Sequence, residues 1–267
     1  MIPSLLTDTI TTDLDRALHY VLLWGLEGVE LRSVGRLSDR VPFVNESRLR
    51  KRLQEAELPV VAVVPGLFEG DVADRPAWMN ELTALEETFQ FCRRIECPRV
   101  VVSSFSPSDS EESRSIESAA GVLEKAGRLG KTYGVELCVL NESRMLASTG
   151  TQLSRMIDLA GNVSAAWSPA DAVVSGENPL EGLANLSGKV ALVRCRNGEV
   201  IGNGWDPRTI DRGDIDWLEQ IRRLESMGFD GPISLEVTAE PRARQGLLDA
   251  TTMIEYIRTA KREGHRR

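Results

Sequence analysis

Short apolar runs alternate with longer amphipathic segments along the whole chain. The first apolar run is Leu5–Leu6, and a segment with helical periodicity follows over residues 13–24 and ends at Gly25. The same alternation repeats to the C-terminus. The further expected strands are 29–32, 60–64, 100–102, 135–140, 163–167, 190–193 and 233–237, and the further expected helices are 45–57, 76–95, 110–133, 149–159, 179–186, 215–227 and 248–259.

Eight strand–helix units of similar size predict an α/β protein with parallel strands, because apolar strands between helices are covered on both faces. We expect a single (β/α)8 TIM barrel. An open doubly wound sheet would be favoured by a glycine-rich loop after the first strand, but residues 7–11 contain no glycine. No low-complexity linker divides the chain. We therefore expect one domain over residues 1–267, with a basic C-terminal tail from about residue 260.

The composition is typical of a soluble protein, and the net charge of −8 argues against nucleic-acid binding because phosphate backbones are repelled. No apolar run reaches about 18 residues, and the N-terminus has no signal-peptide pattern. We expect a cytoplasmic protein with no membrane partner. The four cysteines form no CxxC pair and are expected to be reduced. The two histidines, His19 and His265, cannot assemble a histidine-rich metal cluster.

In such a barrel the functional residues lie at the C-terminal ends of the strands, so we examined those positions. Glu30 and Arg32 share one face at the end of the second strand, either as a structural ion pair or with Arg32 on a substrate. Glu142 follows the fifth strand as a site carboxylate or a loop residue. Asp171 follows the sixth strand in a Ser-Pro turn that would equally suit a helix N-terminus.

The last two strands end in charged residues. Arg194 and Arg196 share a face, which suits a carboxylate or phosphate because guanidinium groups bind both bidentately; ordinary mouth charges are the alternative. Glu236 lies between two apolar residues and requires a partner, because burial of a lone carboxylate is costly. The long segment 197–211, which contains Arg208, is either a functional lid or a variable surface loop.

Six segments carry a family pattern in order along the chain. They are residues 24–32 (WGLEGVELR), 135–142 (VELCVLNE), 167–172 (WSPADA), 176–180 (GENPL), 212–217 (RGDIDW) and 228–236 (GFDGPISLE). In this order they resemble the sugar phosphate isomerase/epimerase family, the xylose isomerase-like TIM barrels. The resemblance covers essentially the whole chain. It implies a barrel that acts on sugars or sugar phosphates.

The resemblance also implies a divalent metal at the barrel mouth, held by Glu, Asp, His and Glu on strands five to eight. The chain has Leu140, Ser168, Arg194 and Glu236 at these positions, so only the last ligand is kept. Leucine offers no donor atom, and the positive charge of Arg194 would repel a cation. We therefore expect no metal and no other cofactor. We expect Arg194 to take the place of the metal and to pair with Glu236.

A non-catalytic binding protein, or pseudoenzyme, is one function that these substitutions leave open, because three of four implied ligands have changed together. Its partner would be a small sugar, sugar acid or sugar phosphate at the barrel mouth. The residues expected to bind it are Arg194, Arg196, Arg32, Asn141, Asp171 and Arg208. The fold does not fix the substrate, and the resemblance is compatible with a homo-oligomer.

An active isomerase or epimerase is the alternative. Glu236 and Glu142 would act as acid and base, and Arg194 would stabilise the developing negative charge in place of the metal. A shifted metal site of Glu142, Asp171 and Glu236 is a further arrangement. DNA repair is a third class, since endonuclease IV-type enzymes share this barrel, but two badly placed histidines cannot supply their multi-zinc site.

Overall fold

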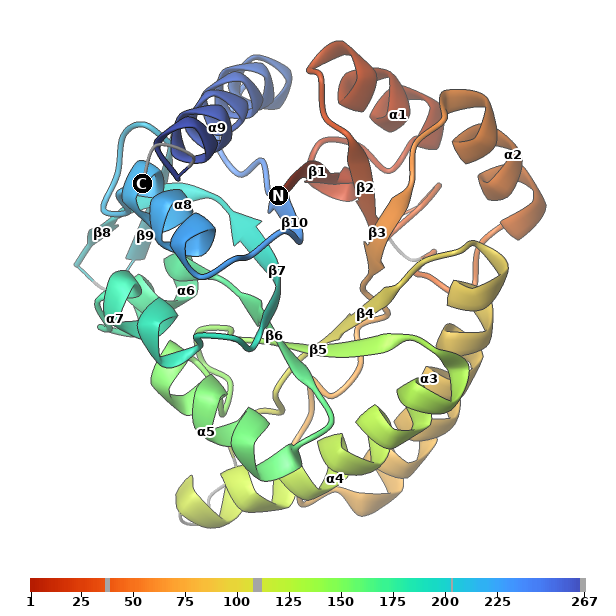
Figure 1. Cartoon of the computed structure of the whole chain (residues 1–267). Coiled ribbons are helices and arrows are strands. Elements are labelled where there is room, and N and C mark those ends of the chain that lie inside the picture. The colour runs from red at the N-terminus through yellow and green to blue at the C-terminus, as the bar shows by residue number, and fades with distance from the viewer. Residues whose placement is uncertain (37–38, 108–111, 203, 265–267) are drawn as a thin grey trace.

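The computed structural model describes residues 1–36, 39–107, 112–202 and 204–264. Its centre is a closed barrel of parallel strands in the order β1-β10-β7-β6-β5-β4-β3-β2 (Figure 1). The barrel strands are β1 (Ile2–Leu6), β2 (Gly28–Leu31), β3 (Val60–Val63), β4 (Arg99–Val102), β5 (Glu136–Leu140), β6 (Ser164–Trp167), β7 (Val190–Cys195) and β10 (Pro232–Leu235). The predicted (β/α)8 barrel is confirmed.

Helices surround the barrel as an outer layer (Figure 1). They are α1 (Leu14–Leu23), α2 (Glu46–Ala56), α3 (Arg75–Arg94), α4 (Glu112–Tyr133), α5 (Gly150–Ala160), α6 (Pro169–Val174), α7 (Pro179–Asn185), α8 (Trp217–Ser226) and α9 (Arg242–Gly264). Local signals explain several boundaries. Asn45 caps α2 by accepting the N–H of Arg48, and Thr149 and Gln152 form a capping box at α5. None of the described helices is long and apolar enough to cross a bilayer.

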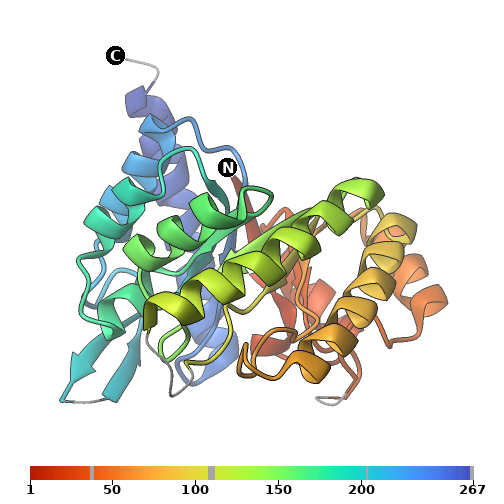
Figure 2. The same cartoon turned by 90° about the horizontal axis from the view of Figure 1, so that it is seen from below.

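The long segment after β7 is not an irregular loop, whereas its role as a lid stays a prediction. It forms an antiparallel hairpin of β8 (Asn197–Ile201) and β9 (Gly204–Arg208), which projects from the body of the molecule (Figure 2). A short 3-10 helix, Thr7–Thr9, follows β1. The helix α9 continues to Gly264, so the first part of the expected basic tail is helical, and residues 265–267 lie outside the described residues.

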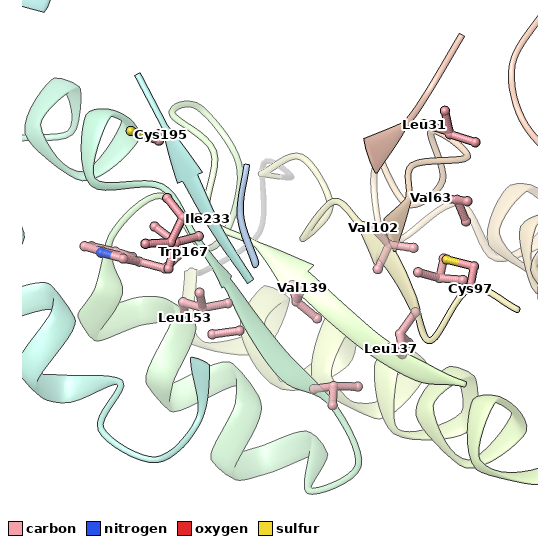
Figure 3. Close-up of a cluster of buried hydrophobic side chains, with 14 of the residues drawn as sticks. Leu31, Val63, Cys97, Val102, Leu137, Val139, Leu153, Trp167, Cys195 and Ile233 are labelled. Atoms are coloured by element: carbon pink, nitrogen blue, oxygen red, sulfur yellow. The ribbon is translucent and has the colours of Figure 1, made fainter. Parts of the chain in front are cut away.

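The hydrophobic core has two layers because successive strand residues face opposite sides of the sheet. The outer layer lies between strands and helices and includes Trp167, Leu153 and Ile233, which Figure 3 shows close together. The smaller inner layer fills the barrel itself. Its apolar members are Ala62, Val101, Cys138, Leu140, Ala166, Ala191 and Leu192. The four cysteines are all buried and free.

Candidate functional site at the barrel mouth

A cavity of about 310 Å³ opens where the barrel strands end. Six of the eight residues that the sequence singled out line its wall, and they come from segments far apart in the chain. They are Arg32, Glu142, Asp171, Arg194, Arg196 and Glu236. The strand-end rule for barrels therefore places most of the candidate residues in one cavity.

Arg194 lies inside the barrel, because its neighbours Val193 and Cys195 on β7 face the helices. Its Nη2 donates to Oε1 of Glu30 on β2 at 2.6 Å, and the two side chains are 4% and 0% exposed. Burial opposes the charge of Arg194, but Glu30 and Glu236 raise its pKa. The expected direct pairing of Arg194 with Glu236 is wrong, because Glu30 reaches the guanidinium across the barrel interior.

Arg196 joins two carboxylates at the rim of the cavity. Its Nη2 donates to Oδ2 of Asp171 at 2.8 Å, and its Nε lies 3.5 Å from Oε2 of Glu236. Burial alone would raise the pKa of Asp171, but Arg196, a backbone N–H and the hydroxyl of Ser168 bring it below its usual value. The ring of Trp205, from the hairpin, lies 5.9 Å from the guanidinium. Arg196 and Asp171 are thus held as a charged pair.

Glu142 has a less polar environment on another part of the wall. Its Oε2 accepts a hydrogen bond from the hydroxyl of Ser103 at 2.6 Å, and it forms no ion pair with any described residue. Burial raises the pKa of Glu142, Asp171 and Glu69 raise it further, and Ser103 and Arg194 oppose the change. The carboxyl of Glu142 therefore holds its proton more tightly than usual.

Two further arginines at the mouth are also paired. The Nε of Arg32 donates to Oδ2 of Asp8 at 2.8 Å, and Arg40 contacts Glu69 at 3.2 Å. Gly66 has a left-handed backbone with φ of 74°, and a Cβ there would collide with the guanidinium of Arg40. Glycine at this position therefore allows Arg40 to lie against the loop after β3. Glu30 and Arg32 do not pair with each other, since each has a different partner.

Negatively charged side chains outnumber positively charged ones at the barrel mouth. The wall contains four arginines, at positions 32, 40, 194 and 196. The carboxylates on the wall or bonded to its arginines number six, at positions 8, 30, 69, 142, 171 and 236. Four against six gives a formal charge of −2 when all are ionised. An anionic ligand is therefore disfavoured, although carboxylates and guanidiniums together can accept from and donate to hydroxyl groups.

Asn141 and Arg208 lie outside the cavity wall. Asn141 is buried, and its side-chain amide donates to the carbonyl of Ser168 at 2.9 Å and accepts the N–H of Ser168 at 2.7 Å. It therefore fixes the turn between β6 and α6. Arg208 ends β9 and pairs with Glu199 and Asp206 at 3.0 and 2.6 Å. Its contacts lie within the hairpin.

The positions at which a metal is implied do not offer its ligands. Leu140 lines the cavity with an apolar side chain, and Arg194 places a positive charge there. Ser168 caps α6 and donates its hydroxyl to Asp171 at 2.6 Å. Of the four positions only Glu236 carries a carboxylate, whereas a divalent cation requires several oxygen or nitrogen ligands. The residues present therefore do not fit the implied metal.

The shifted site of Glu142, Asp171 and Glu236 is not assembled either. Among the residues that the structure describes, no three His, Cys, Asp or Glu side chains gather as metal ligands. Asp171 and Glu236 both approach Arg196, and a cation that used them would meet that guanidinium.

Four polar residues of the wall, or ion-pair partners of its arginines, were not predicted from the sequence. Ser103 directly follows β4 and Asp8 lies just after β1, so the strand-end rule could have found both. Arg40 and Glu69 lie in loops after β2 and β3, and no sequence pattern marks them. Their contact depends on how the two loops pack.

The family model described as xylose isomerase-like TIM barrel matches residues 18–258, whereas no curated protein sequence matches. An L-ribulose 3-epimerase structure has a TM-score of 0.81 at 17% identity, covering 99% of this chain and 97% of that one. An IolI protein with a bound zinc atom has a TM-score of 0.78 at 17% identity, covering 99% and 98%.

A D-tagatose 3-epimerase-like protein is also similar, with a TM-score of 0.80 at 14% identity and coverage of 98% and 99%. At such identities these structures show a shared fold alone, and the chemistry of each site depends on its own residues. The family model is the stronger finding because it matches most of the chain, in line with the motifs found in the sequence. The chain belongs to the xylose isomerase-like TIM barrel family.

Proposed function

We propose that the barrel mouth binds a small carbohydrate without a divalent metal. The observation that carries this proposal is the buried pair of Arg194 and Glu30. A fixed guanidinium occupies one of the positions at which the family resemblance implies a metal ligand. At 4 Å, the guanidinium charge by itself would repel a divalent ion by about 8 kcal/mol at an effective dielectric constant near 20. Its partner Glu30 offsets part of this repulsion, but it is fully buried and does not line the cavity as a ligand. The carboxylate of Glu236, already close to Arg196, cannot offset this alone.

The chemistry of the wall favours a ligand with several hydroxyl groups. Guanidinium N–H groups donate to hydroxyl oxygens, and carboxylates accept from hydroxyl protons. A volume of about 310 Å³ lies at the lower end of the usual range for ligand pockets, which fits a small molecule. The negative charge balance weighs against the sugar acids and sugar phosphates that the sequence also allowed. The sugar epimerases among the similar structures support a carbohydrate ligand.

Calorimetry tests both parts of the proposal. A panel of aldoses and ketoses with five or six carbons is titrated into the protein in EDTA, and Mn²⁺, Mg²⁺ and Zn²⁺ are titrated separately. We expect at least one sugar to bind with EDTA present. Arg196→Gln should weaken this binding about tenfold, the effect of losing one strong hydrogen bond, whereas Arg212→Gln, at a largely exposed position, should leave it unchanged.

Two results would overturn the proposal in different ways. If no sugar binds under any condition, the carbohydrate assignment fails. If one of the metals binds with micromolar affinity and sugar binding requires it, the metal-free assignment fails. In that case Arg194 must leave the barrel interior to make room.

Metal-free isomerisation or epimerisation is a second candidate function. The observation that favours it is that Glu142 and Glu236 line the same cavity, and that burial raises the pKa of Glu142, which makes it a stronger base when ionised. The test is exchange of carbon-bound hydrogen for deuterium in D2O with EDTA present, followed by NMR. Exchange that disappears in Glu142→Gln would establish turnover. If a sugar binds but no exchange occurs, the protein binds the sugar without catalysing this reaction.

A further inference from the structure

Glu142 differs from every other carboxylate of the cavity wall. Among the described residues, the other wall carboxylates each contact an arginine: Glu69 contacts Arg40, and both Asp171 and Glu236 contact Arg196. Glu142 has only the neutral hydroxyl of Ser103, although it is largely buried. A buried carboxylate without an ion-pair partner is costly, and Arg194 acts on Glu142 without bonding to it, so a cationic group of a ligand would stabilise Glu142.

Two arginines of the same wall each have one buried guanidinium N–H without a hydrogen bond. The Nε of Arg194 is buried and has no hydrogen-bond partner, because Glu30 is bonded to Nη2. The Nε of Arg196 also lacks a hydrogen bond, since Glu236 lies 3.5 Å away. An unmet buried donor costs about 1–3 kcal/mol. Because both arginines line the cavity, their guanidinium groups favour a ligand that brings oxygen acceptors.

We propose that the ligand is a small polyhydroxylated amine, such as an amino sugar, whose ammonium group binds Glu142 and whose oxygens accept from Arg194 and Arg196. This inference rests on the proposed carbohydrate function and deepens it. The wall carries four arginines against six carboxylates, counting their bonded partners, so one added cation reduces the charge imbalance. An ammonium group needs only hydrogen-bond acceptors, whereas a metal ion needs a set of ligands that the wall lacks.

The ionisation of Glu142 controls this preference. The charged groups that face it are Asp171 at the start of α6, Glu69 in the loop after β3 and Arg194 on β7, and Ser103 after β4 is its hydrogen-bond partner. Glu142 attracts an ammonium group only as a carboxylate. As the pH falls and Glu142 takes up its proton, an amine should lose its advantage over a neutral sugar of the same size.

Calorimetry with matched ligand series tests the inference. Each series contains a neutral hexose, its 2-amino-2-deoxy form and its aldonic acid, for example glucose, glucosamine and gluconate, with parallel series from galactose and mannose. In at least one series we expect the amine to bind about tenfold more tightly than the neutral sugar and the acid to bind most weakly. Glu142→Gln should remove the advantage of the amine. Glu117→Gln, at an exposed position on α4, removes the same charge and should preserve the advantage.

Other results of this calorimetry would contradict either the amine assignment or the carbohydrate function. Equal binding of amine and neutral sugar in every series overturns the amine assignment and leaves the carbohydrate function standing. Tightest binding of an acid would show that the arginines dominate, which also overturns it. Absence of binding by every sugar, neutral or charged, refutes the carbohydrate function itself. If Glu142→Gln does not fold, a pH series on the unmodified protein decides, because an amine advantage that stays constant down to about pH 3, well below the ordinary pKa of a glutamate, contradicts the role of Glu142.

Discussion

The two halves of the barrel interior have different chemistry. The inward residues of β1, β2, β7 and β10 include the buried polar side chains of Ser4, Glu30, Arg194 and Ser234. The buried inward residues of β3, β4, β5 and β6 near the mouth are the apolar side chains of Ala62, Val101, Cys138, Leu140 and Ala166. The polar residues on the same strand faces, Arg99, Glu136 and Ser164, contact one another at the opposite end of the strands. These two sets of four neighbouring strands, the polar half and the apolar half, together close the barrel.

The difference shows how neighbouring partners set the behaviour of a carboxyl group. Asp171 is bonded to Arg196 of the polar half, and its pKa is lowered although burial opposes this. Glu142 follows β5 of the apolar half, and burial raises its pKa. Both carboxyls are largely buried, so their opposite shifts come from their partners: Asp171 has a bonded guanidinium, a backbone N–H and a hydroxyl, whereas Glu142 is bonded to one hydroxyl. Near the mouth, the polar half contains the buried ion pair of Arg194 and Glu30, whereas Glu142, after β5 of the apolar half, has no ion-pair partner among the described residues and is available to a ligand.

The largest effect is expected from breaking the ion pair of the polar half. Arg194→Met would leave Glu30 buried without its partner, which should cost about 3–5 kcal/mol of unfolding free energy. Urea unfolding followed by circular dichroism measures the change. The double variant Arg194→Met, Glu30→Leu is the control and should recover most of the loss, because it removes both charges. A loss in the double variant as large as in the single one would show that shape, rather than charge, decides.

A smaller loss is expected from the apolar half. Leu140→Ala removes a buried side chain of the inner layer and should cost about 2 kcal/mol, at the low end for leucine because the new space adjoins the cavity and can admit water. The same urea experiment compares it with Arg194→Met. If Leu140→Ala costs more than Arg194→Met, the view that the buried ion pair is the more sensitive feature is incorrect.

The pH dependence of stability should have opposite signs at the two carboxyls. Asp171 has a lowered folded pKa, so its contribution is present above its usual pKa and is lost as the pH falls through the folded pKa. Asp171→Asn should therefore cost about 1.5 kcal/mol at pH 7 and progressively less as the pH falls below the usual pKa of an aspartate. Glu142 has a raised folded pKa, so its contribution is present at low pH and is lost as the pH rises. Glu142→Gln should therefore match the unmodified protein at pH 4 and exceed it at pH 8.

Unfolding free energies measured for both variants across this pH range test the comparison. Each variant serves as the reference for the other, because both replace a carboxyl by an amide of nearly the same shape. If the change in unfolding free energy caused by each substitution varied with pH in the same direction, the assignment of the two environments would be contradicted.

Much of the fold followed from the sequence because its signals are local. The alternation of apolar runs and helical segments predicted the barrel. Asn45 was predicted as an N-cap, and its side chain accepts the N–H of Arg48, three residues later. The hairpin after β7 was missed. Its strands contain two glycines, Gly198 and Gly204, and Pro207, which are typical of loops.

The site was predictable in location and less so in its contacts. The strand-end rule placed Arg194, Arg196 and Glu236 at one mouth. It could not choose among carboxylates for Arg194, because β2 and β7 are separated in the barrel by β1 and β10 and meet only across the interior. A pairing of this kind depends on the tertiary structure, and no spacing in the sequence encodes it.

The smallest effect is expected at Arg208, outside both halves of the barrel. Its guanidinium bonds Glu199 and Asp206 within the exposed hairpin, and exposed ion pairs contribute little. Arg208→Gln should therefore leave the urea midpoint and the affinity for the best-binding sugar unchanged, in contrast to Arg196→Gln. A clear loss of affinity in Arg208→Gln would mean that the hairpin folds over the mouth when a ligand binds, and the binding surface would then extend beyond the barrel itself.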